Sequence, residues 1–411
     1  MKKLFLFAFF ACIIFTVKAQ KKKAVFIIID GVGKDVIEKL ATPNINAIAR
    51  EGAFISAYQG GERGEYNQTP TISSPGYNNV LTGVWYNKHN VPDNNIKAPN
   101  YYYPTIFSFF KTQYPEKKIG VFSSWEDNRT KLVGDGLQQT GNIKVDYKFD
   151  GLELDTIKYP HDKARQFMAK IDQAVTDEAA RCISENAPDL SWVYLEFTDD
   201  MGHAFGDSKQ YHDAVMAADQ RIGKIWEAVK QREKQFKEDW IIIVTTDHGR
   251  DPKTGRGHGG QSDRERSSWI ATNAKPLNVY ARKGKASVVD ILPTLVKHLG
   301  VQLSAEQKRE LDGVSLLGNV SVFNVEAKLA ENKVNLKWMS GDGKGMAKIS
   351  IAHTNNYKQT GKDDIYSFVA EVPVGKGSFE VDLTKIPKSE IYKIIIEGPH
   401  NTVNRWIVNK K

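Results

Sequence analysis

The sequence predicts an α/β fold, with a doubly wound, mostly parallel sheet followed by a small C-terminal all-β, sandwich-like domain. Three largely apolar segments, each followed closely by an aspartate, indicate buried parallel strands over 24–29, 192–197 and 240–244. Helical periodicity between them indicates crossover helices. After residue 317 the pattern changes to short alternating segments separated by Gly, Asn, Asp and Pro, which is typical of antiparallel strands.

The first strand leads into Asp30-Gly31, and the next helix is expected directly after Thr42-Pro43. Apolar residues recur at helical spacing in four segments. The predicted helices span 44–50, 163–185, 212–235 and 288–299. Their alternation with the strands favours helices on both faces of one sheet. The C-terminal strands are expected within 320–338, 347–353, 366–374, 378–383, 391–397 and 403–408.

Residues 69–83 predict a loop that turns into a short helix. Ser74 suits the N-cap, Pro75 the first helical position and Gly83 the residue just beyond the end. Ser73 would then lie at the positive end of the helix dipole, where an anion is favoured. Taken alone, Ser-Ser-Pro is more often simple helix punctuation, so the interpretation depends on the rest of the chain.

Composition and charge restrict the function classes. The chain has 411 residues, 41% hydrophobic and 26% charged, with a formal charge of +8. This suits a globular protein of more than one domain, and no arginine-rich face indicates nucleic-acid binding.

Residues 1–19 are expected to be a secretory signal, which predicts a periplasmic or secreted protein. Lipid attachment at Cys12 is disfavoured because the apolar segment continues beyond it, and Cys182 would then be the one remaining cysteine. The expected domains are 20–317, catalytic, and 318–411, accessory.

Three aspartates and three histidines follow the predicted strands or lie in glycine-rich loops. They are Asp30, Asp199, His203, Asp247, His248 and His258. One such aspartate is usually a turn or capping residue, but this many beside histidines indicate metal ligands. Asp199 and His203 are expected in a turn after the second strand. Mixed carboxylate and imidazole ligands favour zinc, and six of them suit two ions with open positions. Coordination would also lower the pKa of the Ser73 hydroxyl and make it a nucleophile.

These motifs resemble the alkaline-phosphatase superfamily over roughly residues 24–317, and within it the nucleotide pyrophosphatase/phosphodiesterase branch. The segments that carry the resemblance are Asp30-Gly31, Pro70-Thr71-Ile72-Ser73-Ser74-Pro75, His89-Asn90-Val91-Pro92-Asp93-Asn94, Asp199-x-x-Gly-His203, Asp247-His248-Gly249 and His258. The resemblance implies a phosphodiesterase with a phosphoseryl intermediate on Ser73. Asn94 and the Ser74 backbone N–H would then bind the phosphoryl group. It further implies that Asp199, His203 and His258 hold one Zn²⁺, and that Asp30, Asp247, His248 and Ser73 hold the other.

The branch's asparagine and histidine after the motif proline are Gly76 and Tyr77 here, and its lysine before the nucleophile is Ile72. These departures concern the substrate class, and three alternatives stay open. A phosphomonoesterase would need an additional cation, for which Arg250, Arg256 and Arg264 are candidates. A sulfatase would carry arginine where this chain has Tyr77. An inactive binding scaffold would have kept the fold without activity. The natural substrate and the oligomeric state are left open.

Overall fold

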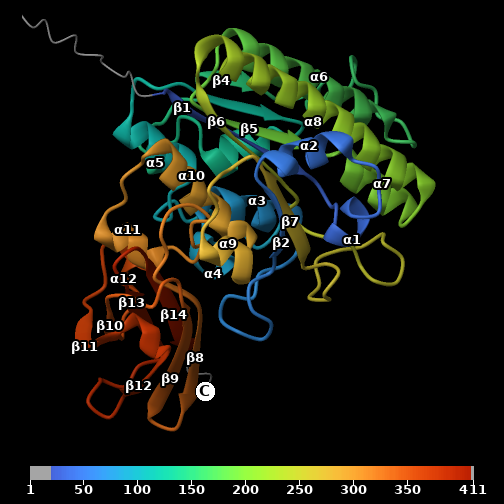
Figure 1. Cartoon of the computed structure of the whole chain (residues 1–411). Helices are drawn as coiled ribbons and strands as arrows, with labels where there is room; N and C mark the ends of the chain where they lie inside the picture. The colour runs from blue at the N-terminus through green and yellow to red at the C-terminus, as the bar shows by residue number, and fades with distance from the viewer. Residues whose placement is uncertain (1–19, 409–411) are drawn as a thin grey trace, which may run out of the picture.

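The computed structural model describes residues 20–408, so the predicted signal segment 1–19 lies outside the described residues. Its larger part is built on a seven-stranded sheet in the order β2-β7-β6-β1-β5-β3-β4 (Figure 1). The strands are β1 (Lys22–Ile29), β2 (Ala53–Tyr58), β3 (Ile119–Ser123), β4 (Tyr147–Phe149), β5 (Leu190–Leu195), β6 (Asp239–Thr245) and β7 (Ser267–Thr272). The pairings of β1 with β5 and β6, and of β3 with β4 and β5, are parallel, whereas β7 pairs antiparallel with β2 and β6. The predicted mostly parallel sheet is confirmed.

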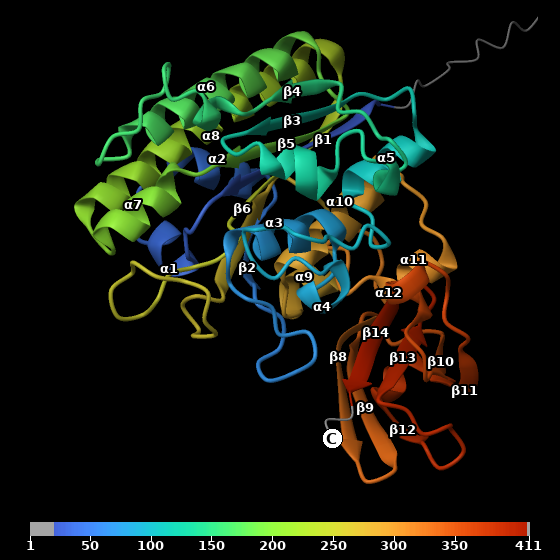
Figure 2. The same ribbon diagram turned by 180° about the vertical axis from the view of Figure 1, so that it is seen from behind.

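Helices cover both faces of this sheet, as Figure 2 shows from behind. One face carries α1 (Lys34–Ile37), α2 (Pro43–Glu51), α6 (Gln166–Glu185), α7 (Phe197–Phe205) and α8 (Lys209–Phe236). The other carries α3 (Ser73–Thr82), α4 (Tyr86–His89), α5 (Ile106–Gln113), α9 (Val279–Lys283) and α10 (Ile291–Leu299). Along β1, Val25 and Ile27 join the first core and Ala24 and Phe26 the second. Because both faces of β1 are buried, its sequence is continuously apolar.

The C-terminal strands form two antiparallel sheets, β11-β10-β13-β14 and β12-β9-β8, which the sequence predicted as a sandwich. Their elements are β8 (Val322–Ala330), β9 (Lys333–Ser340), β10 (Met346–Ala352), α12 (Asn356–Thr360), β11 (Ser367–Pro373), β12 (Ser378–Asp382), β13 (Ile391–Glu397) and β14 (Thr402–Val408). The expectation of a single segment over 320–338 is wrong. The chain reverses at Glu331, whose φ is 54°, so that this segment and its continuation form the β8–β9 hairpin.

Buried charges join the two parts of the molecule near α11 (Ala305–Glu310). The Lys88 Nζ of α4 donates to Asp312 Oδ1 at 2.6 Å and to Asn404 Oδ1 of β14 at 3.0 Å. Lys393 of β13 pairs with Glu310 and, at 2.7 Å, with Asp364. The junction cluster, as we call this group, comprises Lys88, Glu310, Asp312, Asp364 and Lys393. These contacts cross the predicted domain boundary after residue 317. That boundary stays a prediction.

Among residues 20–408, none of the helices combines the length and apolar character needed to cross a membrane. Cys182 is buried and forms no disulfide within residues 20–408.

Candidate active site

The helix that carries the predicted nucleophile is buried along its whole length. α3 begins at Ser73, and Ile72 is its N-cap. The expectation of Ser74 as N-cap and Pro75 as first helical residue is therefore wrong, because the helix starts two residues earlier. Ile72 is extended, and its carbonyl accepts the first helical bond from Gly76 N at 2.9 Å. Gly83 ends the helix with φ 66°, as predicted.

The backbone N–H of Ser74 is bound outside the helix. It donates to Asn94 Oδ1 at 3.0 Å, which brings two of the predicted substrate-binding groups together. This contact satisfies one of the N–H groups that a helix leaves open in its first turn. Ser73 itself is 6% exposed. The structure therefore places a nearly buried serine at the first position of α3, beside Asn94.

The first predicted ligand group is assembled around α7. Ligand atoms of Asp199, His203 and His258 lie within 4.8 Å of one another. His203 Nε2 is 3.1 Å from Asp199 Oδ2 and 3.0 Å from His258 Nε2. The expectation that Asp199 and His203 lie in a turn is wrong, because both lie within the helix α7. Their spacing of four residues places both side chains on one face of that helix.

The second predicted group lies at the carboxyl ends of β1 and β6. His248 Nε2 is 3.3 Å from Asp30 Oδ1 and 3.2 Å from Asp247 Oδ2. Asp199 also joins Asp30 and His248 within 4.8 Å, and the rings of His248 and His258 stack with centroids 3.8 Å apart. The two groups therefore adjoin. We call all six residues the ligand cluster: Asp30, Asp199, His203, Asp247, His248 and His258.

Three buried atoms of this cluster have no hydrogen-bond partner among residues 20–408: Asp30 Oδ1, Asp247 Oδ2 and His248 Nε2. A buried polar atom without a partner is costly, and native proteins satisfy almost all of them. The three atoms converge on one another and combine carboxylate oxygens with an imidazole nitrogen. This donor set fits a zinc-type cation.

The pKa values in the cluster reflect the same concentration of charge. Burial and the charge of Asp30 raise the pKa of Asp247 well above its ordinary value. Burial lowers the pKa of His248, but the charges of Asp247 and Asp30 act more strongly together and raise it to about 9. Burial and the charge of His248 lower the pKa of His258 to about 4. The cluster holds more negative charge than its own imidazoles neutralise easily.

Side chains that the sequence did not assign to the site hold the ligands in place. Tyr194 donates its hydroxyl to Asp30 Oδ2 at 2.7 Å, and Tyr77 donates to the same oxygen. Both bonds go to Oδ2, so Asp30 Oδ1 has no hydrogen-bond partner among the described residues and faces His248. Tyr77 was visible in the sequence only as a departure from the branch, and nothing in the sequence indicated Tyr194.

Arg250 is fully buried and donates to Asp199, to the Gly255 carbonyl at 2.8 Å and to the Arg256 carbonyl at 2.7 Å. Burial acts to raise the pKa of Asp199, but the hydrogen bond with His203 and the positive charge of Arg250 outweigh burial and hold that pKa below its ordinary value. Arg250 thus orients a ligand. It is not available as the additional cation that a phosphomonoesterase would need.

The helix of Ser73 is seated directly against the ligand cluster. A Cβ at Gly76 would lie 2.8 Å from Asp247 Cβ and 2.9 Å from the Asp247 carbonyl oxygen. Only glycine permits this approach. Ser73 is four residues before Tyr77, whose hydroxyl contacts Asp30, so both lie on the same face of α3. The Thr71 carbonyl also lies 2.9 Å from His258 Nδ1, which ties the loop before Ser73 to the first ligand group.

Comparisons with known proteins show which proteins this chain is similar to. The sequence model of the family described as type I phosphodiesterase/nucleotide pyrophosphatase matches residues 24–256. Ectonucleotide pyrophosphatase/phosphodiesterase family member 7 of Rattus norvegicus is 21% identical over 248 residues, which cover 56% of this chain and 51% of that protein. An uncharacterized pyrophosphatase/phosphodiesterase of Schizosaccharomyces pombe is 22% identical over 235 residues, covering 56% and 44%. The chain thus spans about half the length of the curated relatives it matches.

Among solved structures, murine ectonucleotide pyrophosphatase/phosphodiesterase 5 aligns with a TM-score of 0.45 and 14% identity, covering 68% of this chain and 96% of that one.

Proposed function

The chain belongs to the type I phosphodiesterase/nucleotide pyrophosphatase family, and on that premise we propose that it is a zinc-dependent phosphodiesterase acting through a phosphoseryl intermediate on Ser73. The observation that carries the proposal is the convergence of three buried atoms without a hydrogen-bond partner among the described residues, on Asp30, Asp247 and His248, beside the helix that begins at Ser73. A nucleophile at a helix N-terminus next to a cation site is suited to attack on a phosphate ester.

Two zinc ions would be held by the ligand cluster. Asp199, His203 and His258 would bind one, and Asp30, Asp247 and His248, with Ser73, the other. When bound, the ions would neutralise phosphoryl oxygens and lower the pKa of the Ser73 hydroxyl. Tyr77 and Tyr194 would keep Asp30 Oδ1 directed at its ion by binding the other oxygen.

Ser73 would do the covalent chemistry. Its Oγ attacks phosphorus and loses its proton, and the bond from phosphorus to the leaving alcohol breaks. The alcohol departs with a proton, leaving a phosphoserine. Water then attacks the phosphoserine, which restores Ser73 and releases the phosphomonoester. A covalent intermediate of this kind divides one difficult reaction into two easier displacements.

Asn94 would bind the phosphoryl group through its amide nitrogen. Because Oδ1 accepts the Ser74 N–H, the amide is oriented with Nδ2 as the remaining donor. Asn94→Ala should cost about 2–4 kcal/mol of transition-state stabilisation, the range for one lost oxyanion donor. Equal kcat/KM values for the variant and its parent would show that Asn94 is structural only.

The shortage of free positive charge near Ser73 supports a diester as the substrate. A monoester carries one more negative charge, which an additional cation would have to neutralise. Two of the three candidate arginines are already bound. Arg250 is buried on Asp199, and Arg264 pairs with Asp207 at 2.6 Å and with Asp35 at 3.0 Å. The side chain of Arg256 is exposed. A phosphomonoesterase would have to use Arg256 or a third cation.

A panel of matched esters tests the proposal. The protein is assayed with nitrophenyl phosphodiester, nitrophenyl phosphate and nitrophenyl sulfate after loading with zinc, and its metal content is measured by mass spectrometry. We expect the highest kcat/KM on the diester and close to two ions per chain. A preference for the monoester or the sulfate would replace the proposed reaction class, and a protein without metal or turnover would be a binding scaffold.

We also propose that residues 1–19 direct export and are removed after Ala19. The motivating features are Lys2 and Lys3, the apolar segment 4–17 and a cleavage motif with small residues at positions 17 and 19. N-terminal sequencing of protein recovered outside the cytoplasm should begin at Gln20.

A further inference from the structure

The segment that leads into the proposed nucleophile is long and has no regular structure of its own. Residues 59–72, which we call the nucleophile loop, connect the end of β2 to Ser73, and none of them belongs to a helix or strand. Connections of this length without regular structure are uncommon and are usually functional. Gly60, Gly61 and Gly64 have φ values of 91°, 64° and 74°, and glycine restricts the backbone less than any other residue. The conformation of the loop therefore depends on what it contacts.

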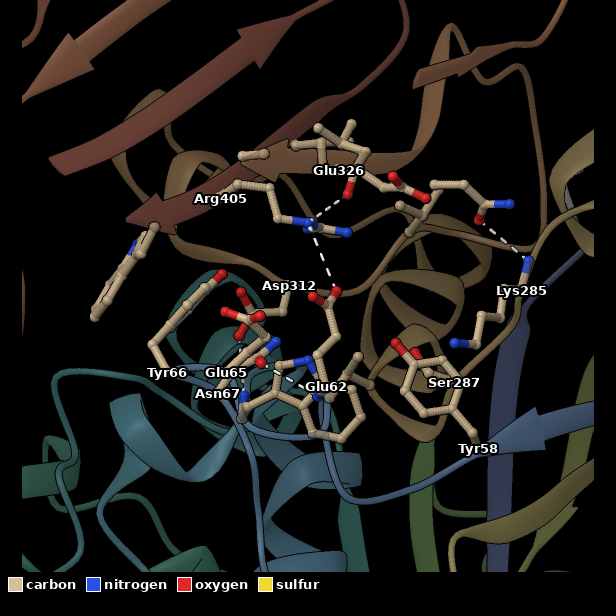
Figure 3. Close-up of a pocket in the computed structure, with 18 of the residues that line it drawn as sticks. Tyr58, Glu62, Glu65, Tyr66, Asn67, Lys285, Ser287, Asp312, Glu326 and Arg405 are labelled. Carbon is tan, nitrogen blue, oxygen red and sulfur yellow. Dashed lines mark hydrogen bonds and ion pairs between the residues drawn. The ribbon is translucent and has the colours of Figure 1, made fainter. Parts of the chain in front are cut away.

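The middle of the nucleophile loop rests on the C-terminal strands. The ring of Tyr66 stacks on that of Trp406 in β14, with centroids 5.6 Å apart and 15° between the ring planes. Glu62 Oε1 lies 3.9 Å from Nε of Arg405 in the same strand, and Figure 3 shows Glu62 pointing toward Arg405. Trp406 is 5% exposed, and both lysines of the junction cluster lie 5.0 Å from the centroid of its ring. Trp406 is thus fixed from several sides and gives the loop a firm point of attachment.

The end of the nucleophile loop is bound to the segment that carries His258. The Thr71 carbonyl accepts a hydrogen bond from His258 Nδ1 at 2.9 Å, and the Thr71 hydroxyl donates to the Gly260 carbonyl at 2.8 Å. The Gly259 N–H donates to the same hydroxyl at 3.0 Å. Since a carbonyl oxygen only accepts, Nδ1 carries the proton and Nε2 is left as the ligand atom. Thr71 therefore orients a candidate metal ligand, and it lies two residues before Ser73.

Hydrogen bonds within the nucleophile loop connect these two attachments. Asn67 Oδ1 accepts the Glu62 N–H at 3.2 Å, which closes the loop around Tyr66. Beyond that point, the Thr69 N–H donates to the Gly60 carbonyl at 2.9 Å. Asn67 and Thr69 are both buried. A displacement of Tyr66 is therefore carried along a chain of packed and hydrogen-bonded groups toward the nucleophile.

We propose that the C-terminal strands position the nucleophile, with Tyr66 and Trp406 as positioning residues that act through the nucleophile loop. The inference rests on the proposed function, because it takes Ser73 as the nucleophile. The aromatic stack fixes the middle of the loop, and the end of the loop holds Ser73 and the ring of His258. Attack on phosphorus needs closely aligned atoms, and a misplacement of about 1 Å costs about 100-fold in rate. Loss of the stack should therefore affect the reaction more than the fold.

The test compares Tyr66→Ala, which removes the stack, with Tyr66→Phe, which keeps the ring. We expect Tyr66→Ala to lower kcat for the parent's best nitrophenyl ester about 10–100-fold, and to change KM by a smaller factor because the ligand cluster remains. Tyr66→Phe should restore kcat to the parent's level. Hydrogen–deuterium exchange, measured by mass spectrometry, should rise over residues 67–76 in Tyr66→Ala alone, because a loosened backbone exchanges faster.

Tyr357→Ala is the matched control. Tyr357 of α12 is 6% exposed, and its ring packs on Tyr103 at 5.3 Å, so it joins the C-terminal part to Tyr103 rather than to the nucleophile loop. The control variant should be less stable, while kcat and the exchange over residues 67–76 keep the parent's values. Circular dichroism verifies folding, and Tyr66→Leu takes the place of Tyr66→Ala if that variant does not fold.

The proposal is overturned if Tyr66→Ala keeps the parent's kcat, if Tyr66→Phe fails to restore it, or if Tyr357→Ala loses it equally. A parent that hydrolyses none of the esters would contradict the proposed function instead. The exchange measurement then decides alone. A rise over residues 67–76 that is confined to Tyr66→Ala supports the positioning of the loop by the C-terminal strands, and the absence of such a rise overturns it.

Discussion

The ligand cluster and the junction cluster are both groups of buried charge, and they are neutralised in different ways. In the junction cluster, Lys88 and Lys393 are fully buried, and each pairs with a carboxylate of the same cluster. In the ligand cluster, Asp30 Oδ1 and Asp247 Oδ2 have no hydrogen-bond partner among the described residues, and the only basic group beside both is the imidazole of His248, which they share. Buried charge is tolerated only when it is paired or coordinates a metal. The first cluster supplies its own cations, whereas the second contains the candidate metal ligands.

The pKa values express this difference. Burial lowers the pKa of Lys88 against the opposing charges of Asp312 and Glu310. Burial also acts to raise the pKa of Asp364, but the bonds from Lys393 and its other donors outweigh it and keep the value below normal. Asp247, by contrast, has a raised pKa because it is buried and because its strongest charged neighbour is another acid, Asp30. The charges of the junction cluster therefore stabilise one another within the protein. The carboxylates of the ligand cluster lack enough positive charge from the protein, as expected of a candidate metal site.

The largest expected effect is on turnover and comes from replacing the nucleophile, which belongs to neither cluster. Ser73→Ala should lower turnover of the diester by about 10⁴-fold or more, because it removes covalent catalysis. Zinc content and the free energy of unfolding should change little, since the six residues of the ligand cluster remain. Steady-state kinetics and metal analysis on the same preparation check this. Normal hydrolysis by the variant would show that Ser73 is not the nucleophile.

The next effect falls on the junction. Lys88→Met should lower the free energy of unfolding by about 3–5 kcal/mol, because it leaves Asp312 buried without its cation. The metal content should stay at the parent's level. Urea denaturation measures the loss. The control is Lys333→Met, which breaks an exposed pair with Glu380 and should cost less than about 1 kcal/mol. Equal losses in the two variants would mean that the junction cluster is not a buried structural pair.

Removal of metal should act on the ligand cluster alone. With free zinc at about 100 times the Kd of each site, chelation should lower the free energy of unfolding by about 2.7 kcal/mol for each ion removed. The same treatment should affect Lys88→Met by an equal increment, because the two clusters share no residue and independent changes add. Thermal unfolding with and without chelator checks both values. A protein whose stability is unchanged by chelation would contradict the idea that the ligand cluster needs external cations.

The features of the ligand cluster that could be predicted from the sequence are those that follow from local patterns of apolar residues and glycine. The strands ending at Asp30 and Asp247 were visible because a strand buried on both faces is continuously apolar, and parallel strands bring their carboxyl ends to one edge. The stop at Gly83 was visible because a helix end with positive φ favours glycine.

The parts that escaped prediction depend on contacts between distant segments. Asp199 and His203 were expected in a turn, but they lie in a helix whose Gly202 is packed against Arg250, where a Cβ would be 2.6 Å from Arg250 Cζ. The start of α3 was misplaced because the Ser74 N–H is bound by Asn94 from another loop. Neither contact leaves a local pattern.

The smallest predicted effect concerns a residue of this second kind. Tyr77→Phe removes a hydroxyl that donates to Asp30 but keeps the ring, so the fold should survive. Outer-shell bonds of this sort orient a ligand, and their loss typically costs 10–100-fold in metal affinity. We therefore expect zinc to bind about 10-fold more weakly, as measured by competition with a chromophoric chelator.

Tyr103→Phe is the matched control, because Tyr103 is also buried and donates its hydroxyl to a carboxylate, Glu310 of the junction cluster, at 3.2 Å. It should leave zinc affinity unchanged and lower stability by about 1 kcal/mol, the typical value of one hydrogen bond. If instead both variants weaken zinc binding alike, the two clusters are coupled through the fold. The hydroxyl of Tyr77 would then have no specific role in orienting Asp30.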